Sequence, residues 1–209
     1  MNKLIIFDWT GVIKDALTAH LWVVNRIFKN HGLSEISADE FHDNWIEPYM
    51  KFFNKYLPEM TVEEEQKEYR EAAMDPEYPK SKCVEGIKEM LVKLADKKYK
   101  MMVVSSDLPE TVNKELVEFG INNIFVKVIS GVSDKSGAIK ETVSLYSGDR
   151  NHVYIVGDSV HEIQVGKPLG IKTIAVTWGF GSKGSLESML PDKIFEDVAD
   201  LQNYLLMEK

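Results

Sequence analysis

The sequence predicts an α/β protein with a Rossmann-like open parallel sheet, into which an all-helical subdomain is inserted. Two observations support this prediction. Short apolar runs alternate with segments of helical spacing through most of the chain, which is typical of parallel strands buried on both faces and joined by helices. The stretch 15–74 breaks this alternation, because it contains helical patterns and no convincing strand.

Five short runs of mostly β-branched or aliphatic residues are the predicted strands. They are LIIF (4–7), MMVV (101–104), IFVKVI (124–129), VYIV (153–156) and KTIAV (172–176). Runs of this length without a clear polar alternation indicate strands with both faces covered. We therefore expect helices on both sides of the sheet.

Three segments between these strands have helical spacing. The segment 84–97 repeats apolar residues on one helical face, namely Ile87, Met90, Leu91 and Leu94. The segment 110–120 follows Pro109, a typical first-turn residue, and ends on Gly120, a typical residue after a helix C-terminus. The third segment is 135–146. Helices between successive strands imply parallel strand pairing with right-handed crossovers.

The helical insertion lies between the first and second predicted strands. Its segments are AHLWVVNRIFKNHG, ADEFHDNWIEPYMKFFNKYL and TVEEEQKEYREAAM, and the last opens with the capping-box pair Thr61 and Glu64. DPEYPKSK (75–82) is a linker back to the sheet. We expect a core domain of residues 1–14 and 80–209 and a helical cap domain of residues 15–79.

The composition narrows the class of protein. It is 44% hydrophobic and 28% charged, as in ordinary globular enzymes, and the net charge of −8 argues against a nucleic-acid-binding surface. Cys83 is the single cysteine, so we expect no disulfide framework and a reducing, cytoplasmic setting. LIIF is too short for a secretory leader, and no apolar run approaches the ~20 residues of a membrane span. We expect neither a membrane nor a nucleic-acid partner, and either a monomer or a homodimer.

Polar side chains follow several of the predicted strands. Asp8 ends the first strand, Ser105 and Ser106 end the second, Asp158 ends the fourth, and Lys135 lies in the loop after the third. The carboxyl ends of parallel strands share one edge of a sheet, where ligands bind. Two carboxylates there suit Mg²⁺, which prefers carboxylates, waters and a substrate phosphate. A hydroxyl and a lysine beside the metal suit the oxygens of a transferring phosphoryl group.

Four motifs carry a resemblance to a known family. They are FDWTGV, MMVVSS, the lysine at position 135 and IVGDSVHEI, in this order along the chain. The set resembles the motifs of the haloacid dehalogenase-like (HAD) superfamily, in which the first is usually written DxDGT or DxDGV. Glu162 stands where the fourth motif normally has its second aspartate. The stretch IKTIAVTWGFGS is similar to the tail of phosphoglycolate-phosphatase-like members.

The resemblance implies a Mg²⁺-dependent reaction at the first motif. Asp8 would attack phosphorus and form an aspartyl-phosphate. The main-chain carbonyl of Thr10 and the carboxylate of Asp158 would complete the protein's metal ligands. Glu162 would hold the metal through a water or directly, or would orient its neighbours. The substrate would be a small phosphorylated metabolite.

The resemblance also assigns groups that bind the phosphoryl oxygens. Ser105 would donate a hydrogen bond to one of them, and Lys135 would offset their charge. The main-chain amides from Trp9 to Gly11 and those at the helix start around Ser106 would add donors. The cap would close over the site and select the substrate.

Thr10 departs from the family pattern, because most family phosphatases have a second aspartate there. That aspartate protonates the leaving oxygen and later activates water, which threonine cannot do near pH 7. General acid–base help is typically worth 10²–10⁴-fold, so the sequence predicts a slow phosphatase. Phosphonoacetaldehyde hydrolases often have DWAGT as their first motif, with a tryptophan in the position of Trp9, and they form a Schiff base on a cap lysine. Lys51 is the candidate for that lysine. A carbon–phosphorus hydrolase, a phosphotransferase and a weak phosphate-binding regulator are the alternatives.

Overall fold

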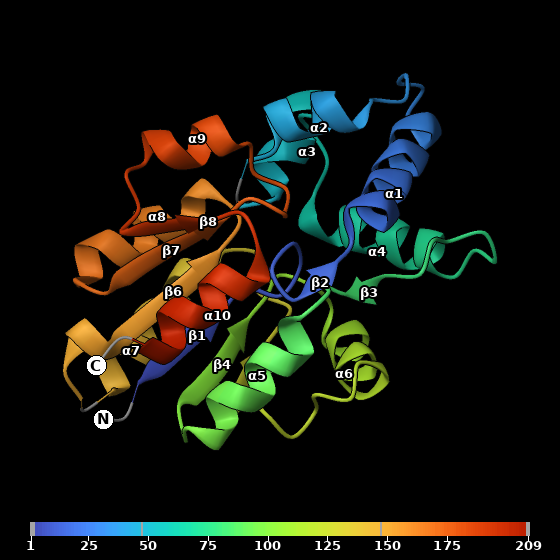
Figure 1. The fold of residues 1–209 in the computed structure, drawn as a ribbon. Coiled ribbons are helices and arrows are strands. Elements are labelled where there is room, and N and C mark those ends of the chain that lie inside the picture. The colour runs from blue at the N-terminus through green and yellow to red at the C-terminus, as the bar shows by residue number, and fades with distance from the viewer. Residues whose placement is uncertain (1–2, 47, 147, 208–209) are drawn as a thin grey trace.

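Six parallel strands form the central sheet of the computed structural model, which describes residues 3–46, 48–146 and 148–207 (Figure 1). Their order is β5-β4-β1-β6-β7-β8. The bounds are β1 Leu4–Phe7, β4 Lys100–Val104, β5 Lys127–Ile129, β6 Val153–Gly157, β7 Lys172–Val176 and β8 Lys193–Phe195. The strand β1 lies between β4 and β6 and pairs in parallel with both. The carboxyl end of β1 therefore lies near the middle of the sheet edge.

Helices cover both faces of this sheet, as the apolar strands predicted (Figure 1). Alternate residues of β1 enter different clusters: Ile5 and Phe7 pack with α5, α6 and α10, whereas Leu4 and Ile6 pack with α7 and α8. The helices are α5 Ile87–Asp96, α6 Pro109–Glu118, α7 Ser136–Leu145, α8 Val160–Gly166, α9 Lys183–Ser188 and α10 Val198–Met207. Two short 3₁₀ helices, Arg150–His152 and Lys167–Leu169, precede β6 and β7. The predicted Rossmann-like α/β fold is confirmed.

Four helices, which we call the cap, lie between the first strand and the rest of the sheet in the sequence. They are α1 Leu17–Asn30, α2 Ala38–Asn44, α3 Met50–Tyr56 and α4 Val62–Ala73. They share an apolar cluster rich in aromatic side chains, among them Phe28, Phe41 and Phe52. The capping box of Thr61 and Glu64 is present at the start of α4. The division into domains of 1–14 with 80–209 and of 15–79 remains our proposal, and this separate cluster supports it.

The two chain segments that join the cap to the core pair with each other. They form a short antiparallel ribbon of β2 Lys14–Asp15 and β3 Lys82–Cys83. The sequence did not predict this ribbon, because two residues per strand leave no periodic pattern. Within the described residues, no helix is long and apolar enough to cross a membrane.

Three other boundaries differ from the predictions. The strand expected over 124–129 begins only at Lys127, because residues 122–124 form a turn. The edge strand β8 was not predicted, since three residues with one exposed side chain give little signal. The cap segment 38–57 contains two helices rather than one continuous pattern, and Glu47 between them lies outside the described residues.

Candidate active site

Four predicted site residues meet at the carboxyl end of the sheet. Asp8 follows β1, Asp158 follows β6, Glu162 lies in the first turn of α8, and Lys135 is the residue just before α7. The Lys135 Nζ lies 2.8 Å from Asp8 Oδ2 and 2.7 Å from Glu162 Oε1. All four side chains are buried. The parallel topology therefore brings together groups that are up to 154 residues apart, between Asp8 and Glu162.

The three carboxylates are arranged as a candidate metal centre. One oxygen from each of Asp8, Asp158 and Glu162 lies within 4.8 Å of the others. Burial would raise the pKa of Glu162, but Lys135 and His161 together outweigh burial through their charges and hydrogen bonds and hold that pKa well below its usual range. A set of buried, hard carboxylate oxygens fits Mg²⁺. These residues therefore fit the predicted cofactor, although the identity of the metal rests on this chemistry alone.

Two glycines let the chain approach the Asp158 carboxylate closely. A Cβ atom at Gly11 would lie 2.0 Å from Asp158 Oδ2, and one at Gly179 would lie 2.1 Å from it. Gly11 also has a φ of +85°, in the left-handed region that favours glycine. The Phe180 N–H donates to Asp158 Oδ2 at 2.6 Å. Asp158 is thus fixed by backbone that only small residues permit.

A buried polar network fixes the turn after Asp8, and the sequence analysis missed it. Thr10 Oγ1 donates to Asp107 Oδ2 at 2.8 Å. Lys14 Nζ contacts Asp107 Oδ2 at 2.9 Å and Glu115 Oε1 at 3.0 Å. Trp9 Nε1 donates to Glu115 Oε2 at 2.9 Å. The side chains of Trp9 and Thr10 therefore both reach one ionic cluster centred on Lys14.

The charges in this network stabilise one another. Burial alone would lower the pKa of Lys14 and raise that of Asp107. The acidic neighbours of Lys14, Asp107 first among them, together outweigh burial and raise its pKa well above the ordinary value, and Lys14, Thr10 and His20 together lower the pKa of Asp107. Burial raises the pKa of Glu115, and Lys14 opposes this in part. Lys14 and Asp107 are thus ionised at neutral pH. The one sequence signal was a charged residue, Glu115, on the apolar face of α6 beside Val112 and Leu116.

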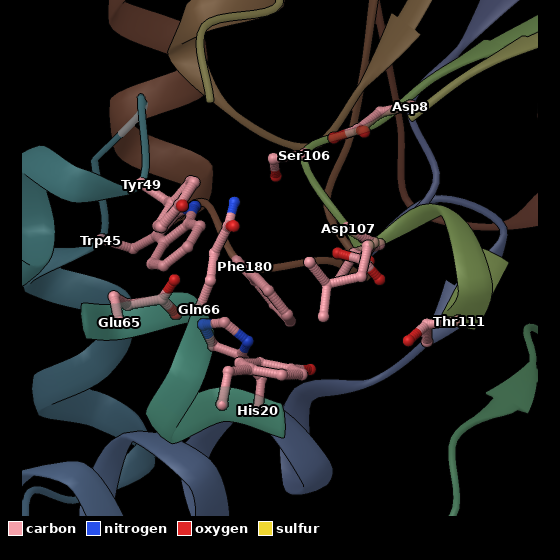
Figure 2. Close-up of a pocket in the computed structure, with 13 residues that line it drawn as sticks. Asp8, His20, Trp45, Tyr49, Glu65, Gln66, Ser106, Asp107, Thr111 and Phe180 are labelled. Atoms are coloured by element: carbon pink, nitrogen blue, oxygen red, sulfur yellow. The ribbon is translucent and has the colours of Figure 1, made fainter. Parts of the chain in front are cut away.

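The two serines after β4 have different positions. Ser105 is buried, and its Oγ accepts a hydrogen bond from the Asp107 backbone N–H at 3.0 Å. Ser106 lines the cavity that also contains Asp8 (Figure 2). Their roles toward a phosphoryl group remain predictions.

The expected main-chain donors near Asp8 are partly engaged within the chain. The Trp9 N–H donates to Asp8 Oδ1 at 2.7 Å, and the Gly11 N–H donates to the Lys14 carbonyl at 2.8 Å. In this structure these two N–H groups organise the turn itself. Their predicted contact with substrate therefore requires them to exchange partners.

Lys51 is not brought to the site. It lies on α3 with an exposed side chain and is absent from the described residues that line the cavity. The position of a lysine in the cap sequence does not reveal whether its side chain reaches the cavity, because one face of each cap helix points to solvent. The structure therefore gives no support to Lys51 as a Schiff-base or substrate-binding residue.

A cavity extends from Asp8 into the cap (Figure 2). It encloses about 620 Å³ of space, open solvent included. The core contributes Asp8, Thr10, Ser106, Asp107, Leu108, Thr111 and Phe180 to its lining, and the cap contributes His20, Trp45, Tyr49, Glu65, Gln66 and Tyr69. The sequence analysis did not single out His20, Glu65 or Gln66, because helical spacing does not reveal which residues face a cavity.

Comparisons with known proteins agree with this geometry. A family model described as haloacid dehalogenase-like hydrolase matches residues 5–176. A phosphoglycolate phosphatase of Synechococcus elongatus is 23% identical over 95% of both chains, and a pyrophosphatase PpaX of Oceanobacillus iheyensis is 24% identical over 95% of this chain and 94% of its own. The crystal structure of a predicted phosphatase from Clostridium acetobutylicum has the same fold, with a TM-score of 0.86, 18% identity and complete coverage of both chains.

Proposed function

This chain belongs to the haloacid dehalogenase-like hydrolase family as a phosphatase, and on that premise we propose that it is a Mg²⁺-dependent enzyme acting on a small phosphate ester through an aspartyl-phosphate. The observation that carries the proposal is the position of Asp8. Its carboxylate lies at the base of the cavity, beside Lys135, Asp158 and Glu162. The proposed nucleophile thus lines the cavity and lies beside a cation and two further carboxylates that would hold the metal.

Asp8 has the surroundings of a nucleophile. In the proposed reaction a carboxylate oxygen of Asp8 forms a bond to phosphorus while the bond from phosphorus to the leaving alcohol breaks. Lys135, 2.8 Å from Asp8 Oδ2, is placed to offset the charge of the phosphoryl oxygens. Asp8, Asp158 and the Thr10 carbonyl would hold Mg²⁺ with Glu162 beside them. When bound, the ion supplies positive charge that lowers the repulsion between carboxylate and phosphate.

Thr10 makes this proposed phosphatase a slow one. Its hydroxyl donates to Asp107 and is not an acid near neutral pH. Leaving alcohols must therefore depart without a proton from this position, and general acid help of 10²–10⁴-fold is lost. The same feature favours a second candidate, a phosphotransferase that retains its aspartyl-phosphate until an acceptor arrives.

The substrate proposal is a small phosphorylated metabolite, by analogy with relatives named phosphoglycolate phosphatase and pyrophosphatase PpaX. We also propose a cytoplasmic location, because the chain has one cysteine, Cys83, and hence no disulfide framework.

Hydrolysis of p-nitrophenyl phosphate with and without Mg²⁺ tests the proposed reaction. We expect slow, metal-dependent release of nitrophenol from the parent protein and none from Asp8→Asn. Asp96→Asn is a matched control, because Asp96 is exposed at the end of α5. Equal rates in the parent and Asp8→Asn would refute the nucleophile. Transfer of the phosphoryl group from acetyl phosphate to an added alcohol, in place of release of inorganic phosphate, would distinguish the phosphotransferase.

A further inference from the structure

The cavity above Asp8 has an unusual balance of charge. None of the thirteen described residues that line it is lysine or arginine. Besides Asp8 it presents two carboxyl groups, those of Glu65 and Asp107. Lys14 neutralises Asp107 at 2.9 Å. Glu65 is 4% exposed and makes no ion pair with a basic side chain of the described residues.

Apart from Glu65 and Gln66, the cap lining is aromatic. Trp45, Tyr49, Tyr69 and His20 come from the cap, and Phe180 comes from the loop after β7. The ring centroids of Trp45 and Phe180 are 5.2 Å apart, and those of His20 and Phe180 are 5.1 Å apart. Burial lowers the pKa of His20 to about 4, so its imidazole is neutral at physiological pH. These rings offer an apolar surface without positive charge.

Two polar atoms of this lining lack partners. Trp45 Nε1 and His20 Nε2 are buried and have no hydrogen-bond partner among the described residues. Buried polar groups are nearly always satisfied, so such atoms at a cavity indicate a ligand or water. The indole N–H can only donate, and a neutral imidazole nitrogen donates or accepts. A hydroxyl group both donates and accepts, so it is a chemical match for either atom.

We propose that the cavity accepts phosphate monoesters whose leaving alcohol carries no negative charge, and that it rejects anionic leaving groups such as glycolate or phosphate. The proposal rests on the proposed function, because it places the phosphoryl group at Asp8 and the alcohol among the cap residues. An anionic leaving group would be desolvated among aromatic rings and the buried carboxyl group of Glu65, with no lysine or arginine in the described lining to compensate its charge. This chain thus differs in substrate from relatives named for phosphoglycolate and pyrophosphate.

Three esters of matched size test the proposal: phosphoglycolate, ethylene glycol monophosphate and phosphoethanolamine. They differ at the end of a two-carbon leaving group, which is respectively anionic, neutral and cationic. We expect kcat/KM with Mg²⁺ to be at least about tenfold lower for phosphoglycolate than for each of the others, because an anion is costly to bury where no cation compensates its charge. Phosphoglycolate matching or exceeding either of the others would overturn the proposal.

Variants of the cap lining test the electrostatic cause. Gln66→Arg introduces a cation into the lining and should raise the relative kcat/KM for phosphoglycolate, as should Glu65→Gln to a smaller extent. Glu63→Gln is the matched control, because Glu63 is exposed on the same helix. Unchanged ester preference in both lining variants would refute the assigned cause. Parent-like circular dichroism identifies variants that have folded.

A binding measurement separates this inference from the proposed reaction. The dissociation constants of the three esters for Asp8→Asn with Mg²⁺, measured by calorimetry, do not depend on turnover. Weaker binding of phosphoglycolate than of the other two supports the inference even where the parent protein hydrolyses nothing. Hydrolysis by the parent combined with tightest binding of phosphoglycolate refutes the inference and leaves the phosphatase proposal standing.

Discussion

Glu65 should make the protein less stable as the pH rises toward 7. Burial raises the pKa of its carboxyl to about 7. The hydrogen bond from Tyr49 and the charge of Arg70 oppose this rise, whereas Asp107 and Glu68 increase it. Burial is the largest of these causes, so the folded protein favours the neutral acid. The pKa of Glu65 is therefore higher in the folded protein than in the unfolded chain.

The size of this effect follows from the two pKa values. In the unfolded chain Glu65 titrates near its ordinary value of 4.5, and in the folded protein near 7. Below 4.5 both states hold the proton, and the stabilisation is fully present. Between the two values only the folded state holds it, so the free energy of unfolding falls as the pH rises. At about 1.4 kcal/mol per pKa unit the total loss is about 3 kcal/mol.

Urea unfolding of the parent and of Glu65→Gln between pH 4.5 and 8 measures this loss. Gln keeps the size of the protonated acid and cannot ionise. We expect similar stabilities at pH 4.5 and a variant that is more stable by up to about 3 kcal/mol at pH 8. Glu63→Gln, on the exposed face of α4, should follow the parent. Parallel stability curves for the parent and Glu65→Gln across this range would refute the reasoning.

Three further predictions concern the core. Lys14→Met should lower the free energy of unfolding by about 3–5 kcal/mol, because the half-buried Asp107 and the buried Glu115 lose their shared cation. Urea unfolding measures this loss. Glu162→Ala should raise the Mg²⁺ concentration for half-maximal phosphatase activity by about tenfold or more, as removed partners of a metal site do. Thr10→Asp should speed ester hydrolysis mainly when it is combined with Asp107→Asn. In the single variant the introduced carboxylate would lie beside the carboxylate of Asp107.

Matched variants control for each of these changes. Lys88→Met removes an exposed lysine of α5. Equal unfolding free energies of Lys88→Met and Lys14→Met would contradict the role assigned to the ion pairs of Lys14. Glu141→Ala removes an exposed acid of α7, and an unchanged Mg²⁺ requirement in Glu162→Ala would argue against a metal site there. Equal rates of the single Thr10→Asp protein and the double variant would show that the neighbouring carboxylate has no effect.

The sheet was predictable because its strands are buried on both faces. Runs such as LIIF and VYIV become β1 and β6, in which every residue is buried. The edge strand β8 was missed because its three residues have no fully buried member. The ribbon of β2 and β3 was missed because a two-residue strand is stabilised by its partner and not by its own sequence. Predictability thus follows the depth of burial.

The site likewise contains residues that the sequence predicted and residues that it did not. Asp8, Lys135 and Asp158 were predicted because parallel topology sends the ends of neighbouring strands to one edge, whereas Glu162 was predicted from the resemblance of its motif. The ionic cluster on Lys14 was missed, since its partners lie 93 residues or more away and share no local pattern. In the cap, helical spacing identifies an apolar face but does not distinguish a residue facing the cavity from one inside the cluster.

The position of Asp107 explains what the threonine at position 10 changes. A carboxylate is present near the place where family phosphatases keep their acid, 2.8 Å from Thr10 Oγ1. Lys14 holds it ionised, so at neutral pH it accepts hydrogen bonds and has no proton to donate. The arrangement therefore leaves the departing alcohol unassisted. We expect the rate to depend steeply on the pKa of that alcohol, and a flat dependence would require a proton donor elsewhere in the cavity.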